Sequence, residues 1–66
     1  MKLSIDKAAD ALYLKLEDSE PLESEEVSPG VVLDYDTDGR VIGVEILNVS
    51  ERGERVDLKS VVLENM

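Results

Sequence analysis

Residues 34–45 fit two structures that exclude each other, and this segment constrains the fold more than any other part of the chain. Their letters, DYDTDGRVIGVE, match the calcium loop of an EF-hand, in which acidic residues surround the ion and a glycine makes the turn. Such a loop needs a helix on each side. Pro29 and Gly30 break a helix upstream, and the downstream residues 41–47 are rich in β-branched residues, with apolar residues at every second position as in a strand. We therefore predict a β-hairpin.

The predicted hairpin turns at residues 36–39, where Asp36 begins a type I turn and Gly39 takes the left-handed conformation that follows. In this register Leu33 lies opposite Ile42. Glu45 then lies four residues along the sheet from Asp34, about 13 Å at about 3.3 Å per residue, so one ion cannot join them. The sequence predicts no cofactor and no catalytic residue. Only a weak surface site for a divalent cation is considered, with the candidates Asp34, Asp36 and Asp38.

A second hairpin is predicted at the start of the chain, where apolar residues alternate with polar ones. With residues 7–10 as the loop, Leu3 lies opposite Leu14 and Ile5 lies opposite Leu12, so these side chains share a face. The alternative is a helix through residues 6–16, because Ala and Leu are good helix formers.

The rest of the chain contains a connection and a C-terminal segment. Residues 17–26 carry six acids, and residues 23–27 are predicted as a short edge strand, followed by a turn at Pro29 and Gly30. Residues 51–66 form a C-terminal segment that packs on the sheet or on a second protomer. Within it, residues 57–64 form either a short helix that begins at Asp57 or a strand.

Together these elements predict a mainly β (α+β) fold, in which residues 1–50 form a small antiparallel meander of four to five strands built from two hairpins. One face of this sheet is strongly apolar. A sheet must cover such a face with another layer, and a short helix offers little cover, so we predict a homodimer. The apolar face consists of Leu3, Ile5, Leu12, Leu14, Leu16, Val31, Leu33, Ile42, Val44 and Ile46.

Composition excludes several classes of protein. The 66 residues include no Cys and no His, so the chain forms no disulfide and no conventional zinc site, and a cytoplasmic location is expected. The net charge of −9 opposes binding to nucleic acid and to anionic membranes, and it suits a basic protein partner. Catalysis is not expected, because no serine or lysine lies beside a recognisable base.

Three segments of the chain carry a resemblance to a known family. They are residues 6–14 (DKAADALYL), 25–36 (EEVSPGVVLDYD) and 38–47 (DGRVIGVEIL). In this order they resemble domain-of-unknown-function family 2283, over about residues 2–50. The resemblance implies a compact β-rich fold and a prokaryotic source, and it implies no activity. Small acidic proteins of this kind also resemble the antidotes of bacterial toxin–antitoxin pairs, which is an analogy.

The preferred function is therefore a small acidic, non-enzymatic protein-interaction module. The alternatives are an antitoxin-like neutraliser of a basic toxin, an enzyme that depends on acidic residues or on a divalent cation, and a small-molecule sensor at a dimer cleft. The residues predicted to contact a partner lie on the second face of the sheet and in the C-terminal segment. They are Tyr13, Val32, Val41, Leu47, Leu58, Val61 and Val62.

Overall fold

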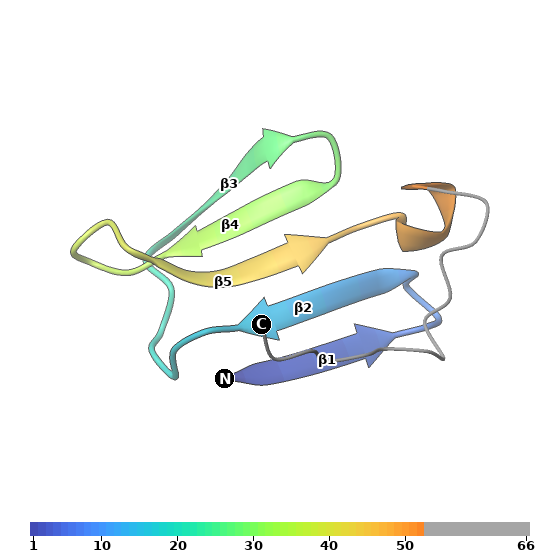
Figure 1. Cartoon of the computed structure of the whole chain (residues 1–66). Helices are drawn as coiled ribbons and strands as arrows, with labels where there is room; N and C mark the ends of the chain where they lie inside the picture. Colours follow the sequence, from blue (N-terminus) through green and yellow to red (C-terminus); the bar gives the residue numbers. More distant parts are fainter. Residues whose placement is uncertain (53–66) are drawn as a thin grey trace, which may run out of the picture.

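The computed structural model describes residues 1–52, which form one five-stranded antiparallel sheet followed by a 3-10 helix (Figure 1). The predicted mainly β fold is confirmed. The helix or strand predicted at residues 57–64 lies outside the described residues. The elements are β1 (Lys2–Asp6), β2 (Ala11–Lys15), β3 (Glu23–Ser28), β4 (Val31–Tyr35), β5 (Val41–Ile46) and η1 (Val49–Arg52).

The strands lie in the order β1-β2-β5-β4-β3, so the sheet departs from a sequential meander at one place. After β2 the chain crosses to the far edge of the sheet, where β3 begins, and β5 returns to pair with β2 (Figure 1). The acidic strand β3 is thereby an edge strand, as predicted, and its charges discourage pairing with another chain. The apolar strand β5 occupies the centre.

The first hairpin has the predicted register, with Leu3 opposite Leu14 and Ile5 opposite Leu12. The alternative of a helix through residues 6–16 is therefore wrong. The turn is stabilised by the Asp6 side chain, which accepts a hydrogen bond from the Ala9 N–H at 3.0 Å.

The second hairpin confirms the strand interpretation of residues 34–45, but its register differs from the predicted one by two residues. Leu33 lies opposite Val44 and not opposite Ile42. Asp36 pairs with Arg40, so the loop is one residue shorter than predicted, and this moves the register by one residue. A β-bulge beside Tyr35 moves the register by a second residue. Because side chains alternate with a period of two, a shift of two residues leaves the side chains of residues 31–34 and 43–46 on their predicted faces.

The turn of this hairpin is the predicted one. The Gly39 N–H donates to the Asp36 carbonyl at 3.1 Å, and Gly39 has a φ of 79°, which favours glycine. The bulge has one further consequence. Val41 lies opposite Tyr35, and directly opposed residues share a face, so Val41 leaves the second face on which it was predicted.

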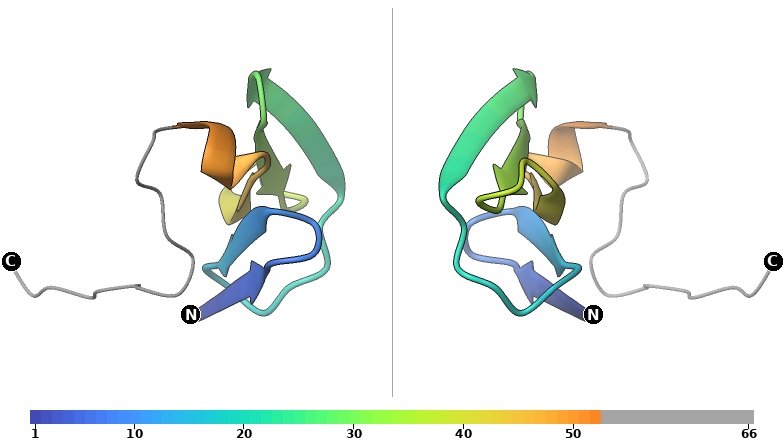
Figure 2. Two further views of the ribbon diagram at one scale, coloured as in Figure 1. Left: turned by 90° about the vertical axis from the view of Figure 1, so that its right-hand side faces the viewer. Right: turned by 90° about the vertical axis from the view of Figure 1, so that its left-hand side faces the viewer.

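The 3-10 helix η1 joins the turns at one end of the sheet. The Ser50 N–H and hydroxyl donate to the Asp10 carboxylate, and the Arg52 guanidinium donates to the Pro29 carbonyl at 2.7 Å. Val49 is only 3% exposed. Figure 2 shows the sheet edge-on as a single twisted layer, with η1 on one side of it. No helix in residues 1–52 is long and apolar enough to cross a membrane.

Candidate functional site

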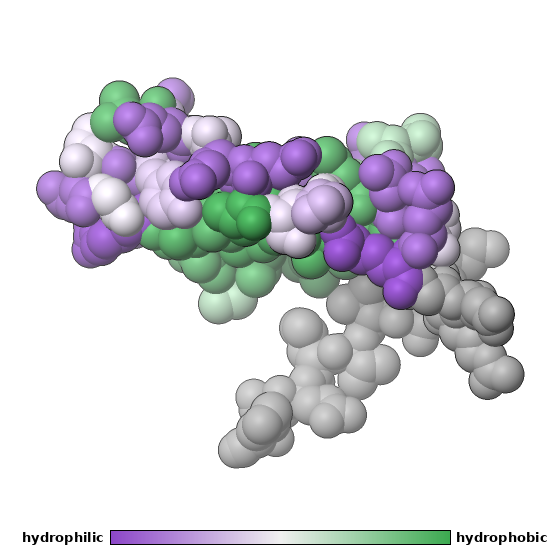
Figure 3. Space-filling model, turned by 90° about the horizontal axis from the view of Figure 1, so that it is seen from above, coloured by the Kyte–Doolittle hydropathy of each residue, from purple (hydrophilic) through white to green (hydrophobic). Residues whose placement is uncertain are grey.

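The apolar face is the largest candidate contact surface. The register aligns its residues in two rows that cross four strands, and Figure 3 shows hydrophobic side chains gathered along one side of the molecule. The rows are Leu3, Leu14, Val44 and Leu33, and Ile5, Leu12, Ile46 and Val31.

This face is poorly covered by residues 1–52. In the two rows Leu3 is 39% exposed and Ile5 is 37% exposed, and the other members are half-buried. Within residues 1–52, only Ala11, Ile42 and Val49 form a buried apolar core. The second layer that an apolar sheet face requires is therefore not supplied by the described part of the chain.

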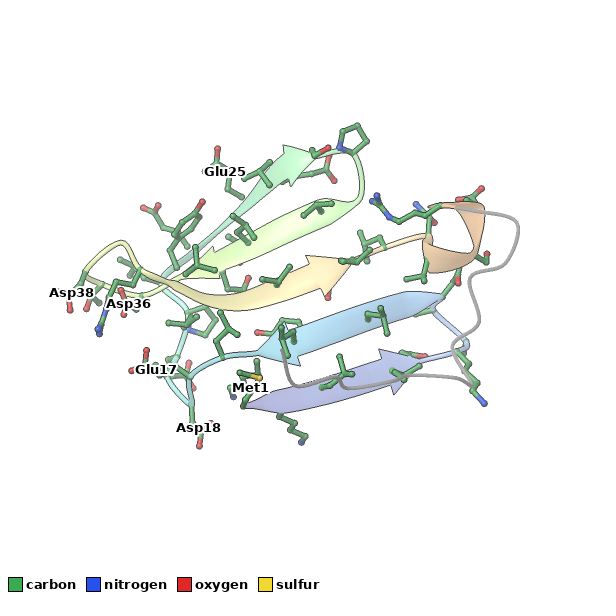
Figure 4. The ribbon with its side chains drawn as sticks, viewed as in Figure 1. Met1, Glu17, Asp18, Glu25, Asp36 and Asp38 are labelled. Atoms are coloured by element: carbon green, nitrogen blue, oxygen red, sulfur yellow. The ribbon has the colours of Figure 1, made fainter. Side chains whose placement is uncertain are left out.

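Acidic side chains border the apolar face. Glu23 lies opposite Tyr35 and Glu25 lies opposite Leu33, so both point to the apolar side at the β3 edge. Figure 4 shows Glu25 beside β3. An apolar centre with a charged margin is the usual composition of a protein-contact surface.

The opposite face, which we call the Tyr13 face, is organised by hydrogen bonds. The Tyr13 hydroxyl donates to Asp34 Oδ2 at 2.7 Å, and the Ser24 hydroxyl donates to Asp34 Oδ1 at 2.6 Å. These bonds join β2, β4 and β3. The bond from Tyr13 crosses β5 at Gly43, where a Cβ atom would collide with the Tyr13 hydroxyl and lie 3.1 Å from Asp34 Oδ2.

The surroundings of Tyr13 favour the neutral form of its phenol. The hydrogen bond to Asp34 raises the pKa of Tyr13, with further contributions from burial and from the negative charges of Asp34 and Glu45. Tyr13 is therefore a hydrogen-bond donor at neutral pH and is unsuited to act as a base. On the same face Lys15 forms an ion pair with Asp18 at 3.0 Å, which lowers the pKa of Asp18.

The three weak metal candidates have different environments. Asp34 is bound by Tyr13 and Ser24. Asp36, 9% exposed, accepts the N–H groups of Asp38 and Arg40 at 2.9 Å each and pairs with the Arg40 side chain at 3.1 Å.

The hydrogen bond from the Arg40 backbone is the main reason why the pKa of Asp36 is lowered. Asp38 lies 3.8 Å from Arg40, and Figure 4 shows Asp36 and Asp38 at the tip of the β4–β5 hairpin. Within residues 1–52, no group of three or more acidic, His or Cys side chains is placed to hold a metal ion. The acids of this turn stabilise the turn itself.

The predicted partner-contact residues are now divided among different places. Tyr13 and Val32 both lie opposite Glu45, so they flank it on the Tyr13 face. Leu47 follows β5, and its N–H donates to the Gly30 carbonyl at 2.8 Å. Val41 lies on the side of Tyr35, because of the bulge. The remaining candidates, Leu58, Val61 and Val62, lie outside the described residues.

Sequence reasoning missed the bond between Tyr13 and Asp34. The available signal was Gly43, since a glycine inside a strand marks a position where another group approaches closely. In the comparison with known families, the family described as protein of unknown function (DUF2283) matches residues 2–50. No curated protein and no solved structure matches the chain.

Proposed function

The chain belongs to domain-of-unknown-function family 2283, and from that premise we propose that it is a small non-enzymatic protein-interaction module that acts as a homodimer. The observation that carries the proposal is the exposure of the apolar face, whose two rows remain half-exposed in residues 1–52. A single core of this size rarely supplies more than about 3–5 kcal/mol, and self-association is a common way to add stability.

A second copy of the chain is the occupant that suits this face best. A two-fold axis brings the same surface of both copies together, so the centre of that surface must tolerate itself. Both rows of the apolar face are uncharged across β1, β2, β5 and β4, and the acids of β3 stand at the margin. In such a pair the apolar rows are buried, and the negative charges stay in water.

The test compares one substitution on each face by sedimentation equilibrium at low micromolar concentration. Leu14→Asp places a charge at the centre of the apolar face, and Ser4→Asp places the same charge on the Tyr13 face of β1. We expect the unmodified protein and Ser4→Asp to be dimers and Leu14→Asp to be a monomer. A monomeric mass for the unmodified protein would refute the homodimer.

The acidic margin also supports a basic protein partner, and an antitoxin-like role is the second candidate. It is favoured by the exposed acids of β3 and of the connection before it, together with the net charge of −9. Affinity purification of the tagged protein from its own host, with mass spectrometry, tests this candidate. A stoichiometric small basic protein supports it, and recovery of the bait alone counts against it.

The geometry gives little support to catalysis by acids or by a bound cation. The carboxylates of Asp34 and Asp36 are both engaged in hydrogen bonds that stabilise the sheet and its turn. A cation at these positions has to displace hydroxyl, backbone or guanidinium donors. The preferred function therefore remains that of an interaction module.

A further inference from the structure

The Tyr13 face contains a hollow of about 320 Å³ between the first hairpin and the end of β5. Its lining residues include Ala11, which is 9% exposed, Tyr13 and Leu47. Two acidic residues, Asp6 and Glu45, also line it. The hollow is thus largely apolar with two negative charges.

The sides of the hollow are held in place by bonds described above. The hydroxyl of Tyr13 is fixed by Asp34 on the far side of Gly43, so its ring is held over β5. Leu47 is held by the bond from its N–H to the Gly30 carbonyl. A preformed hollow of this kind costs a ligand little ordering.

Among the residues that line the hollow, Glu45 has a carboxylate without a side-chain partner in residues 1–52. Its side chain is half-buried, and no hydrogen bond or ion pair joins its carboxylate to another side chain within residues 1–52. Its neighbours across the sheet are Tyr13 and Val32, neither of which is cationic. A carboxylate partly removed from water, beside an aromatic ring, favours a positive charge.

We propose that this hollow binds a lysine or arginine side chain from a basic segment of a protein partner. The aliphatic part of that side chain lies against Ala11 and Leu47, and its charged end lies between the ring of Tyr13 and Glu45. Asp34 and Gly43 act as positioning residues, because they hold the ring. The proposal refines the interaction-module function, but it concerns the face opposite the proposed dimer contact and does not depend on dimer formation.

The test is an amide-shift titration of the isotope-labelled full chain with a hexa-arginine peptide. Salt at about 150 mM weakens attraction between distant charges. We expect the largest shifts at Ala11, Tyr13, Glu45 and Leu47. Glu45→Gln should weaken binding roughly tenfold, because one charge-assisted contact is lost. Glu25→Gln is the matched control, since it removes the same charge from β3 on the other side of the sheet, and it should weaken binding by less than about twofold.

A second pair of variants tests the ring. Tyr13→Leu should weaken binding roughly fivefold, because it removes the ring. Tyr13→Phe keeps the ring but loses the bond by which Asp34 positions it, so it should weaken binding less, by about twofold. Equal weakening by Glu45→Gln and Glu25→Gln, or shifts concentrated on β3, would mean diffuse attraction to acidic residues and would overturn the proposal. Sedimentation of the same samples reports dimer formation independently, so the failure of one proposal is distinguishable from the failure of the other.

Discussion

The apolar face and the Tyr13 face are made by consecutive residues of the same strands. Tyr13 and Gly43 belong to one face, and their neighbours Leu14 and Val44 belong to the other. On the Tyr13 face, hydroxyl and carboxylate groups bind one another across four strands. On the apolar face, residues 1–52 leave the two rows half-exposed. A sheet of one layer can satisfy one face by its own hydrogen bonds, but an apolar face needs another surface.

The largest effect is expected on the apolar face. Leu14 lies between Leu3 and Val44 in the centre of a row. If a second copy covers this row, Leu14→Ala should lower the free energy of unfolding by about 2–4 kcal/mol, as in a buried core. Urea unfolding at two protein concentrations measures this loss, and the midpoint of the unmodified protein should rise with concentration. A loss of about 1 kcal/mol or less, with no dependence on concentration, would show that the row stays in water.

On the Tyr13 face the largest expected effect is at Gly43. A Cβ atom there collides with the Tyr13 hydroxyl, so Gly43→Ala must move the ring away from Asp34. We expect a loss of about 1–3 kcal/mol in the free energy of unfolding, measured by chemical denaturation. A double-mutant cycle with Tyr13→Ala provides the control. If Gly43→Ala costs as much without the ring as with it, the close approach is not the cause.

Gly39, in the turn between β4 and β5, provides a reference for these losses in the free energy of unfolding, because it lies on neither face. Gly39 has a φ of 79°, and a Cβ atom added there meets no other group within 4 Å. Gly39→Ala should therefore cost about 1 kcal/mol from backbone strain alone. The same denaturation measurement applies, and sedimentation should show an unchanged dimer. Unchanged or increased stability would contradict the turn conformation.

The smallest effect at neutral pH is expected for Tyr13→Phe, which removes one hydrogen bond and keeps the ring. We expect a loss of about 0.5–1 kcal/mol at pH 7. The raised pKa of Tyr13 adds a dependence on alkaline pH, because the native state keeps this proton above about pH 10, where an unfolded tyrosine releases it. The stability of the unmodified protein should therefore fall as the pH rises from about 10 through the native pKa of Tyr13. Unfolding curves from pH 8 upward should show this extra fall in the unmodified protein and not in Tyr13→Phe; parallel curves would rule out the raised pKa.

The parts of the fold that sequence reasoning predicted are those controlled by neighbouring residues. The alternation of Leu3, Ile5, Leu12 and Leu14 requires one face, so the register of the first hairpin followed from it. The turn at Gly39 followed in the same way from local turn chemistry. These signals lie within a few residues of the contacts that they specify.

The parts that could not be predicted depend on residues far apart in the chain. The sequences of β2 and β5 contain no local pattern that predicts their pairing with each other. The register error of two residues placed Asp34 opposite Val41, whereas Asp34 lies opposite Gly43. Only the observed register brings Asp34 within reach of Tyr13. The hydrogen bond between Tyr13 and Asp34 therefore depends on a bulge that has no recognisable signal in the sequence.

The strand order has a consequence for the chain while the ribosome is making it. β1 and β2 are synthesised first, but the other edge of β2 has no partner until β5 has been made. Until then the nascent hairpin exposes free backbone groups beside three leucines, of which Leu12 and Leu14 belong to β2 and Leu16 follows it. An open strand edge of this kind can pair with other chains. The acidic residues that follow β2 emerge next, and like charges of this kind oppose pairing between neighbouring chains.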